Sequence, residues 1–143
     1  MKYTDQVVWI TGASSGIGEA LALEFSKEKA KIILSARRAE VLKTVAGKCE
    51  KLGAECLVLP MDVTNYDALK ENVDIVLQKF SKIDVLINNA GVMMCPFSKT
   101  QDGFEIQMGT NHLGPFALTG QLMPLLKKTK DSRIVSTSSI AHT

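Results

Sequence analysis

Glycines and small polar residues near the start of the chain stand at a spacing that could bind phosphate. An apolar run at 7–10 precedes Thr11 and the pattern Gly12-x-x-x-Gly16-x-Gly18. This order predicts a strand, a tight turn and a helix start, where free backbone N–H groups and the positive end of the helix dipole attract an anion. The residues expected to hold the phosphates of a nucleotide are Gly12, Ser14, Ser15, Gly16, Ile17 and Gly18.

The three glycines have separate expected roles. Gly12 lets the chain leave the strand in a conformation that other residues avoid, and Gly16 removes a Cβ that would keep a pyrophosphate away. Gly18 allows the helix to pack tightly on the strand. The spacing differs from the common G-x-G-x-x-G pattern, so an ordinary turn is the alternative unless other motifs support a nucleotide site.

Two arginines follow the next apolar run, 31–36, and bear on which nucleotide binds. At the end of such a run, an acidic residue would hydrogen-bond the ribose hydroxyls of NAD. The chain has Ala36 there, followed by Arg37 and Arg38. Because a guanidinium offers paired donors to a phosphate, the sequence favours NADP over NAD. The alternative is that both arginines are solvated residues at a helix start.

Polar residues also follow the third and fourth apolar runs. Asp62 and Val63 come after the run 56–59, and the Asp62 carboxylate could accept a hydrogen bond from an adenine amino group. The alternative for Asp62 is a residue that starts a helix. The motif Asn88-Asn89-Ala90-Gly91 follows the run 85–87. Ligands bind at the carboxyl ends of the strands in open parallel sheets, so we expect Asn89, Ala90 and Gly91 to border the nucleotide.

Apolar runs and helical periodicities alternate along the chain, which predicts an α/β fold. Continuous apolar strands separated by helices indicate a doubly wound, Rossmann-like parallel sheet with helices on both faces. The expected strands are 7–10, 31–36, 56–59, 85–87 and 133–137. Helices are expected at about 16–28, over 41–52, from an N-cap at Thr64 or Asn65 to Phe80, and at about 104–128. Pro115 and Pro124 should kink or divide the last helix.

The composition is that of an ordinary α/β domain. At 143 residues and 45% hydrophobic, the chain is long enough for one domain with a sizeable core. A net charge of +2, with acids and bases interspersed, gives no reason to expect a nucleic-acid partner. No signal peptide is visible and no apolar run reaches the ~18 residues of a membrane span, so a cytoplasmic protein is expected. The three cysteines lack metal-ligand spacing, so we expect reduced thiols and no metal site.

Taken together, these motifs resemble the short-chain dehydrogenase/reductase family. The stretch 11–18, the pair Asp62-Val63, the stretch 88–91, Asn111 and the pair Ser138-Ser139 occur in the order and at the spacing of that family, and the resemblance covers the whole chain. The first half is similar to membrane-associated dehydrogenase/reductase members, and the second half is similar to retinol dehydrogenases. The family's members are often associated with membranes.

The resemblance implies hydride transfer between nicotinamide C4 and the carbonyl or alcohol group of a retinoid, steroid or other lipophilic small molecule. It also implies catalytic roles for Asn111, which holds a helix and a relay water, and for Ser139, which hydrogen-bonds the substrate oxygen. The neighbouring His112 is expected to be a partly buried structural residue rather than an acid.

One departure from the family concerns its Tyr-x-x-x-Lys pair, which should follow Ser139. The chain has Tyr66 and Lys70 at that spacing, but on the adenine side of the fold. We therefore expect residues 1–143 to form one NAD(P)-binding domain that is incomplete at its C-terminus and has little turnover alone. The alternative is a non-catalytic product that binds nucleotide or a partner protein. The last strand should then be an open sheet edge, where copies of the chain could associate.

Overall fold

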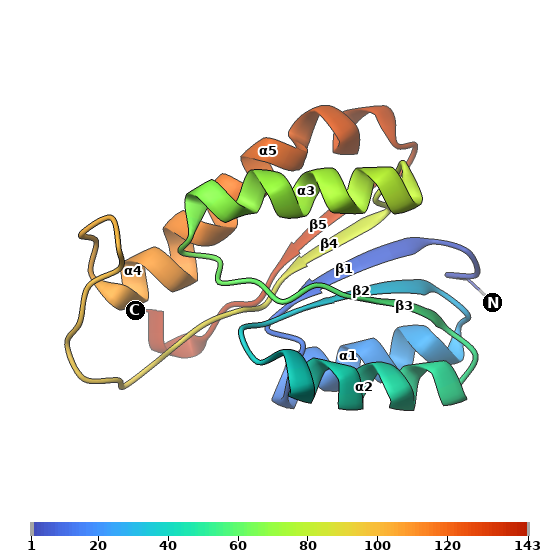
Figure 1. Ribbon diagram of the computed structural model, residues 1–143, viewed down its shortest axis with the longest axis horizontal. Helices are drawn as coiled ribbons and strands as arrows, with labels where there is room; N and C mark the ends of the chain where they lie inside the picture. Colours follow the sequence, from blue (N-terminus) through green and yellow to red (C-terminus); the bar gives the residue numbers. More distant parts are fainter. Residues whose placement is uncertain (1, 143) are drawn as a thin grey trace.

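Five parallel strands form the centre of the computed structural model, which describes residues 2–142. Their order across the sheet is β3-β2-β1-β4-β5, which confirms the predicted Rossmann-like α/β fold (Figure 1). The strands are β1 (Val7–Thr11), β2 (Lys31–Ser35), β3 (Glu55–Val58), β4 (Val85–Asn88) and β5 (Arg133–Ser136). The helices are α1 (Gly16–Lys27), α2 (Ala39–Lys51), α3 (Tyr66–Phe80), α4 (Ile106–Met108), η1 (Gly109–Leu113), α5 (Gly114–Lys128) and η2 (Ile140–His142).

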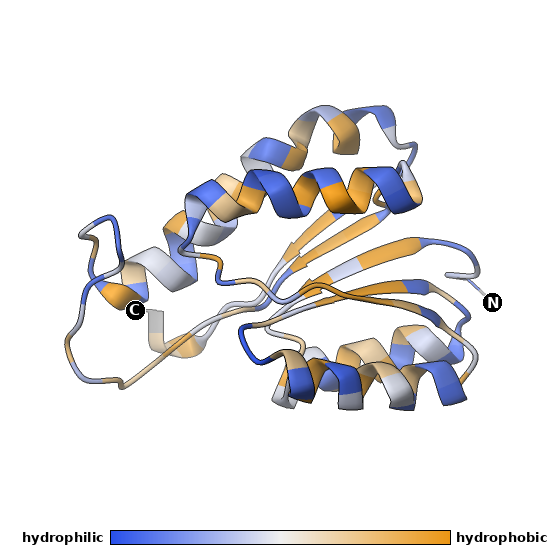
Figure 2. Cartoon of the chain, in the orientation of Figure 1, coloured by the Kyte–Doolittle hydropathy of each residue, from blue (hydrophilic) through white to orange (hydrophobic). Residues whose placement is uncertain are grey.

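The central strand β1 shows why the strands could be recognised from apolar runs. All five of its residues are buried, because helices cover both faces of the sheet. Val7 and Trp9 point into the core beneath α3 and α5, while Val8 and Ile10 point into the core beneath α1 and α2. Figure 2 shows the same division, with apolar strands between helices that carry polar outer faces. Such a strand reads as a continuous apolar run rather than an alternating one.

The order of the strands reverses between β1 and β4, and this reversal defines a crevice. From β1 the chain proceeds to β2 and β3 through α1 and α2 on one face of the sheet, and α3 then returns it to β4 on the other face (Figure 1). The loops after β1 and β4 therefore diverge at the carboxyl edge of the sheet, which leaves space for a ligand between them.

The predicted helix at 104–128 is divided into three parts. A short α4 leads into the π-helical segment η1, and α5 follows with Pro115 in its first turn. Pro115 lacks the N–H that would bond to the carbonyl four residues earlier, and the wider π turn before it accommodates that loss. Pro124 is also predicted to kink or divide the helix, but it does not divide it, since α5 continues through this residue to Lys128. Buried Leu122 and Leu126 anchor α5 to the core on either side of that proline.

No helix among residues 2–142 combines the length and the apolar character needed to cross a membrane. Within the described part of the chain, the edge strand β5 pairs with β4 alone, and all four of its residues are exposed, as expected for an open sheet edge.

One buried carboxylate ties the sheet together at its opposite, amino edge. Asp84 is 9% exposed, and its Oδ2 atom accepts a 2.7 Å hydrogen bond from the Val7 backbone N–H at the start of β1. The Asp84 backbone also bonds to both neighbouring strands, donating to the Val7 carbonyl and accepting from the Arg133 N–H, at 2.9 Å each. The half-exposed Lys82 pairs with the same carboxylate oxygen at 2.9 Å.

We expect Asp84→Ala to lower the free energy of unfolding by about 1–3 kcal/mol, because it leaves the Val7 N–H buried without an acceptor. Lys82→Ala, the matched control, should cost only about 0–1 kcal/mol, because it removes a partly exposed ion pair and leaves the backbone bond intact. Urea denaturation of both variants measures the difference. Equal losses would show that the ion pair, rather than the hydrogen bond to β1, stabilises this edge.

Candidate functional site

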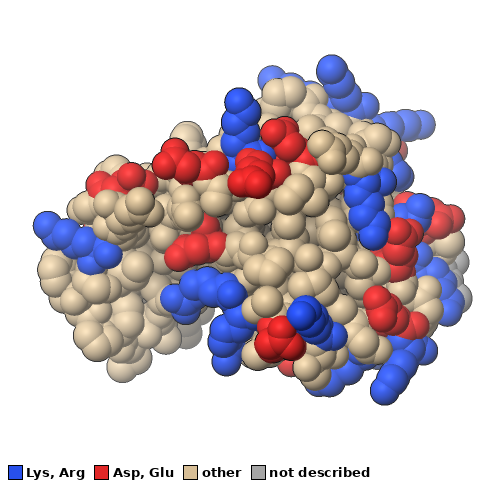
Figure 3. All heavy atoms as spheres, viewed as in Figure 1, with Lys and Arg blue, Asp and Glu red and all other residues tan. Residues whose placement is uncertain are grey.

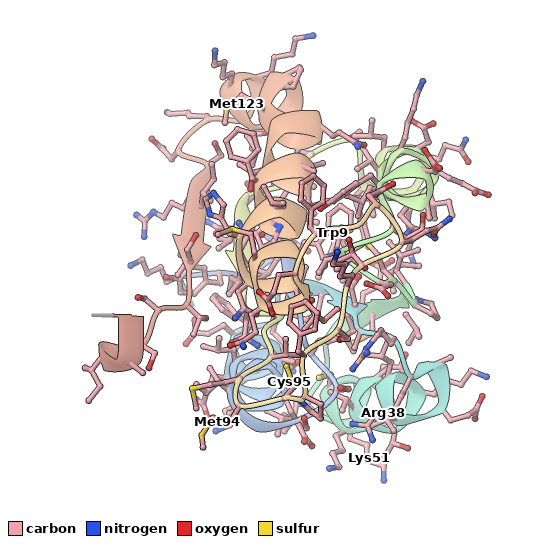
Figure 4. The ribbon with its side chains drawn as sticks, turned by 90° about the vertical axis from the view of Figure 1, so that its left-hand side faces the viewer. Trp9, Arg38, Lys51, Met94, Cys95 and Met123 are labelled. Carbon is pink, nitrogen blue, oxygen red and sulfur yellow. The ribbon has the colours of Figure 1, made fainter. Side chains whose placement is uncertain are left out.

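A groove of about 460 Å³ lies at the carboxyl edge of the sheet, where the strand order reverses. Four strand-to-helix loops meet there, and we call the space between them the first groove. Figure 4 looks onto this edge: the loop carrying Met94 and Cys95 crosses in front of it, and Arg38 extends from the start of α2. The lining residues are Gly12, Ser14, Ser15, Ile17, Ser35, Ala36, Arg37, Arg38, Met61, Asp62, Val63, Asn89, Ala90, Gly91, Val92, Ile106, Thr110 and Thr137.

Of the residues that the sequence predicts to bind cofactor, all line this groove except Gly16 and Gly18. The sequence predicts them separately, from positions that follow four different strands. Parallel strands bring these positions together, because their carboxyl ends share one edge of the sheet.

A hydrogen-bond network between Thr11 and Asn89 fixes the two central loops to each other. The Thr11 hydroxyl oxygen accepts from the backbone N–H groups of Asn89 and Ala90, at 3.0 Å each. In return, the Asn89 amide nitrogen donates to the carbonyls of Thr11 and Gly12, at 3.3 Å each. The Asn89 side-chain oxygen accepts from the Thr137 hydroxyl at 3.0 Å, which adds the segment after β5.

Close contacts explain why two of the three positions in the turn, Gly12 and Gly18, have no room for a Cβ atom. Gly12 has a φ of +64°, and a Cβ there would lie 2.8 Å from the Ala90 Cα. A Cβ on Gly18 would overlap the Gly12 carbonyl oxygen. The tight packing expected at Gly18 is therefore against the turn, rather than against the strand as predicted. Gly16 has a φ of +57°, and none of the described residues has an atom within 4 Å of where its Cβ would be, so the turn is open at that point.

The start of α1 presents backbone donors to the first groove. Ser15, which precedes the helix, is extended and forms no side-chain cap. Within residues 2–142, no acceptor is found for the N–H groups of Gly16, Ile17 and Gly18. Unpaired donors at the positive end of a helix dipole are the chemistry of an anion site, so a phosphate fits here. The acidic residue in the first turn of α1, Glu19, forms an ion pair with Lys48 of α2, with 2.7 Å between Glu19 Oε1 and Lys48 Nζ.

Arg37 and Arg38 border the other end of the first groove. Both are exposed, and Arg38 is the N-cap residue of α2. Within the described part of the chain, neither guanidinium takes part in an ion pair. Figure 3 shows basic side chains projecting where β2 gives way to α2. Two cations without acidic partners are available to an anionic ligand in the groove.

Asp62 has a local structural role beside its place in the groove. Its Oδ1 atom accepts hydrogen bonds from the Thr64 backbone N–H at 2.9 Å and from the Thr64 hydroxyl at 2.8 Å. The N-cap of α3 is Asn65, whose side chain accepts from the Ala68 N–H at 3.2 Å. Asp62 therefore shapes the turn before α3 without capping the helix, and its carboxylate remains exposed along the groove.

A second groove, of about 810 Å³, continues from the first along α5 and β5. The two share the segment 89–92 and Thr137. The remaining lining residues of this second groove are Asn88, Met93, Gln107, Asn111, His112, Pro115, Phe116, Thr119, Ile134, Ser136, Ser138, Ser139 and Ala141. Both predicted catalytic residues, Asn111 and Ser139, therefore lie here, while most of the predicted cofactor residues line the first groove.

The Asn111 side chain is held by one backbone position. Its Oδ1 atom accepts from the Val92 N–H, and its Nδ2 atom donates to the Val92 carbonyl, both at 2.8 Å. This two-point contact joins the π-helical segment η1 to the loop after β4, at the boundary of the two grooves. The Ser139 hydroxyl is exposed, and its oxygen accepts from the Ala141 N–H at 3.1 Å.

Two side chains that could transfer a proton, those of His112 and Tyr66, lie in different surroundings. His112 is exposed in the second groove with its ring 6.2 Å from that of Phe116, so the expectation of a partly buried histidine is wrong. The reason is that η1 directs this residue outward beside Asn111. Tyr66 lines neither groove, and its hydroxyl is buried without a partner among the described residues. Burial and, to a smaller extent, the Asp102 carboxylate raise the pKa of this phenol.

Two further residues belong to the site and were not among the predicted ones. Thr137 lines both grooves, and its N–H donates to the Asn88 carbonyl at 3.0 Å. It is the first residue after β5, the same signal that marks the loops after the other strands. Asn88 is 7% exposed, and its Nδ2 atom donates to the Thr119 hydroxyl at 3.0 Å. No sequence pattern distinguishes its role from that of Asn89.

Solved structures with this architecture include nicotinamide-dependent enzymes. A metagenomic short-chain oxidoreductase in complex with NADP matches 98% of this chain, with 29% identity and a TM-score of 0.87. An NAD+-bound xylitol dehydrogenase matches 99% of this chain, with 31% identity and a TM-score of 0.88. The chain covers 65% of the first protein and 55% of the second.

Curated relatives share about two residues in five with this chain. Retinol dehydrogenase 11 of Homo sapiens is 42% identical over 139 residues, and dehydrogenase/reductase SDR family member 7 of Mus musculus is 40% identical over 146 residues. The matches cover 96% and 98% of this chain, but only 44% and 43% of those relatives. The chain thus spans less than half the length of either protein.

The family model for short chain dehydrogenases matches residues 6–143, almost the entire chain. That match includes every strand of the sheet and both grooves at its carboxyl edge. The chain belongs to the short-chain dehydrogenase family.

Proposed function

We propose that this chain is the NADP-binding part of an oxidoreductase that transfers hydride between the cofactor and a carbonyl or alcohol of a lipophilic small molecule. The observation that carries the proposal is the first groove. Among residues 2–142, the first N–H groups of α1 have no acceptor at one end of it, and Arg37 and Arg38 form no ion pair at the other. Family membership and the nicotinamide-bound structural neighbours support the same chemistry.

The preference for NADP rests on charge. A dinucleotide with its pyrophosphate at the start of α1 would bring its adenosine ribose toward the end of β2. There the chain offers Ala36, which cannot bind ribose hydroxyls, and Arg37 and Arg38, which can bind a 2′-phosphate. The structural neighbours include both an NADP complex and an NAD+ complex, so the arginines are what favours NADP.

The second groove would take the nicotinamide and the substrate. When bound, the cofactor supplies the hydride. Asn111 fixes the loop at the boundary between the grooves, and Ser139 offers a hydroxyl to the substrate oxygen. Met93, Phe116 and Ile134 give the same groove apolar surface, which suits a lipophilic substrate such as those named for the retinol dehydrogenases.

Arg37→Ala should weaken NADPH binding by roughly 10- to 150-fold, the equivalent of a charged hydrogen bond worth about 1.5–3 kcal/mol. NADH binding should be unchanged, because NADH lacks the 2′-phosphate. The control is Lys51→Ala, which removes the same charge from the far end of α2. Isothermal titration calorimetry measures the six affinities of the unsubstituted chain and the two variants for the two cofactors. Equal losses for the two cofactors would contradict the assignment of NADP.

Ala36→Asp should reverse the preference. A carboxylate at this position would accept hydrogen bonds from the ribose hydroxyls of NADH and would repel the 2′-phosphate of NADPH. The ratio of the two dissociation constants measures this change. An unchanged ratio would show that the end of β2 does not face the ribose.

The chain alone should show no turnover of an apolar aldehyde such as retinal. Among the described residues, no tyrosine or lysine lines either groove, so they place no phenol beside a cation where it could protonate the substrate oxygen. The loss of NADPH absorbance is compared with that in a blank without protein, and retinol dehydrogenase 11 serves as the active control. A rate above the blank would contradict this prediction. If His112→Gln abolished that rate, His112 would be the proton donor.

A further inference from the structure

Two hydroxyl groups lie at the ends of neighbouring strands, at the carboxyl edge of the sheet. Thr11 is the last residue of β1, Ser35 is the last residue of β2, and the two are partners in the sheet. The Thr11 hydroxyl accepts from two backbone N–H groups and donates to the Ile87 carbonyl at 3.4 Å. Within the described part of the chain, the Ser35 hydroxyl has one partner, the indole N–H of Trp9, which donates to it at 2.9 Å.

This partner leaves the hydrogen of the Ser35 hydroxyl unused. A serine hydroxyl has one hydrogen to donate and two lone pairs that accept, and the indole N–H of Trp9 can only donate. Among residues 2–142, no acceptor is found for the hydroxyl hydrogen. Ser35 is 1% exposed, and a buried donor without an acceptor costs free energy. A ligand atom that accepts this hydrogen would remove that cost.

Ser35 lines the first groove at the end where the proposed function places adenosine. It directly precedes Ala36 and Arg37, and Asp62 lines the same groove after β3. The Ser35 carbonyl already accepts from the Ala13 N–H at 3.0 Å, which joins this strand end to the turn after β1. The hydroxyl is the donor that the Ser35 side chain offers to a ligand there.

We propose that Ser35 donates a hydrogen bond to the adenosine part of the bound dinucleotide, and that this bond continues the one from Trp9. The inference rests on the proposed function, which brings adenosine to the end of β2. The ring nitrogens of adenine and the oxygens of ribose are acceptors, so either can take the hydrogen. Ser35 therefore contacts a part of the ligand that NADPH and NADH share, unlike Arg37, whose proposed partner is the 2′-phosphate.

The bond from Trp9 makes this contact observable. Trp9 is the only tryptophan of the chain, and its side chain is completely buried in the core beneath α3 and α5 (Figure 4). When a hydroxyl donates to a ligand, its oxygen becomes a better acceptor, because hydrogen bonds in a chain polarise one another. The hydrogen bond from the Trp9 indole therefore strengthens on binding, which moves the resonance of the indole proton to lower field.

A purely structural role for Ser35 has different consequences. A buried indole N–H needs an acceptor, and the Ser35 hydroxyl provides one whether or not a ligand is present. In that case, removal of the hydroxyl would lower the stability of the fold and leave the affinity for nucleotide unchanged. The two roles are therefore separated by the affinity and by the indole signal rather than by stability.

The first measurement is a ¹H–¹⁵N NMR titration of the chain with adenosine 2′,5′-bisphosphate, which carries the adenosine and 2′-phosphate of NADP and no nicotinamide. Shifts in the backbone N–H signals of residues that line the first groove establish binding. We expect the single indole N–H signal of Trp9 to move to lower field and to saturate together with those shifts. Ser35→Ala should remove this movement.

The second measurement is calorimetry with NADPH and NADH. Ser35→Ala should weaken the binding of both by the same factor, about 2- to 12-fold, which is the range for one neutral hydrogen bond. Trp9→Phe is the matched control, because it removes the indole N–H and keeps the hydroxyl, so both affinities should change by less than about twofold. In a chain that already carries Trp9→Phe, Ser35→Ala should still weaken both cofactors. Circular dichroism establishes that each variant is folded.

Three results would overturn the inference. In the first, adenosine 2′,5′-bisphosphate binds the first groove while the indole signal of Trp9 does not move. In the second, the folded Ser35→Ala variant binds both cofactors as tightly as the unsubstituted chain does. In the third, Trp9→Phe alone reproduces the loss of affinity, which would assign the effect to the packing of the tryptophan. If the unsubstituted chain bound neither the bisphosphate nor a cofactor, the proposed function itself would be wrong, and this inference with it.

Discussion

The site depends on one physical constraint: β1 and β4 must end side by side while their following loops diverge. The Thr11 hydroxyl meets this constraint by accepting two backbone N–H groups from Asn89 and Ala90, and the Asn89 amide returns two hydrogen bonds to the first loop. These contacts require the backbones to approach so closely that a Cβ at Gly12 would strike Ala90. Satisfying buried backbone groups in this way leaves the start of α1 as the open donor surface.

Charged groups and neutral groups lie at different places along the carboxyl edge of the sheet. The start of α1 offers neutral backbone donors, and Arg37 and Arg38 stand further out, where they keep their own solvation. The second groove contains amides, hydroxyls, one histidine and apolar side chains. In the function that we propose, an anionic nucleotide and a neutral, apolar substrate would therefore bind to different surfaces on either side of the segment 89–92.

Much of this arrangement could be predicted from the sequence, because the central strands β1, β2 and β4 are buried on both faces and the residue types change abruptly where each strand ends. That rule locates Gly12, Arg37, Asp62 and Asn89 without knowledge of their contacts. It does not predict the pairing of Asn111 with Val92 or the outward position of His112, because both depend on the π-helical segment before Pro115.

The measurement that tests the central claim most directly is a calorimetric titration of the purified chain with NADPH and, separately, with NADH. We expect saturable binding of one cofactor molecule per chain, tighter for NADPH, because the donors of α1 and the two arginines proposed to bind the phosphates all lie in this chain. If a chain that is folded by circular dichroism bound neither cofactor, the account of the first groove would be wrong. Tighter binding of NADH would contradict the role given to the arginines.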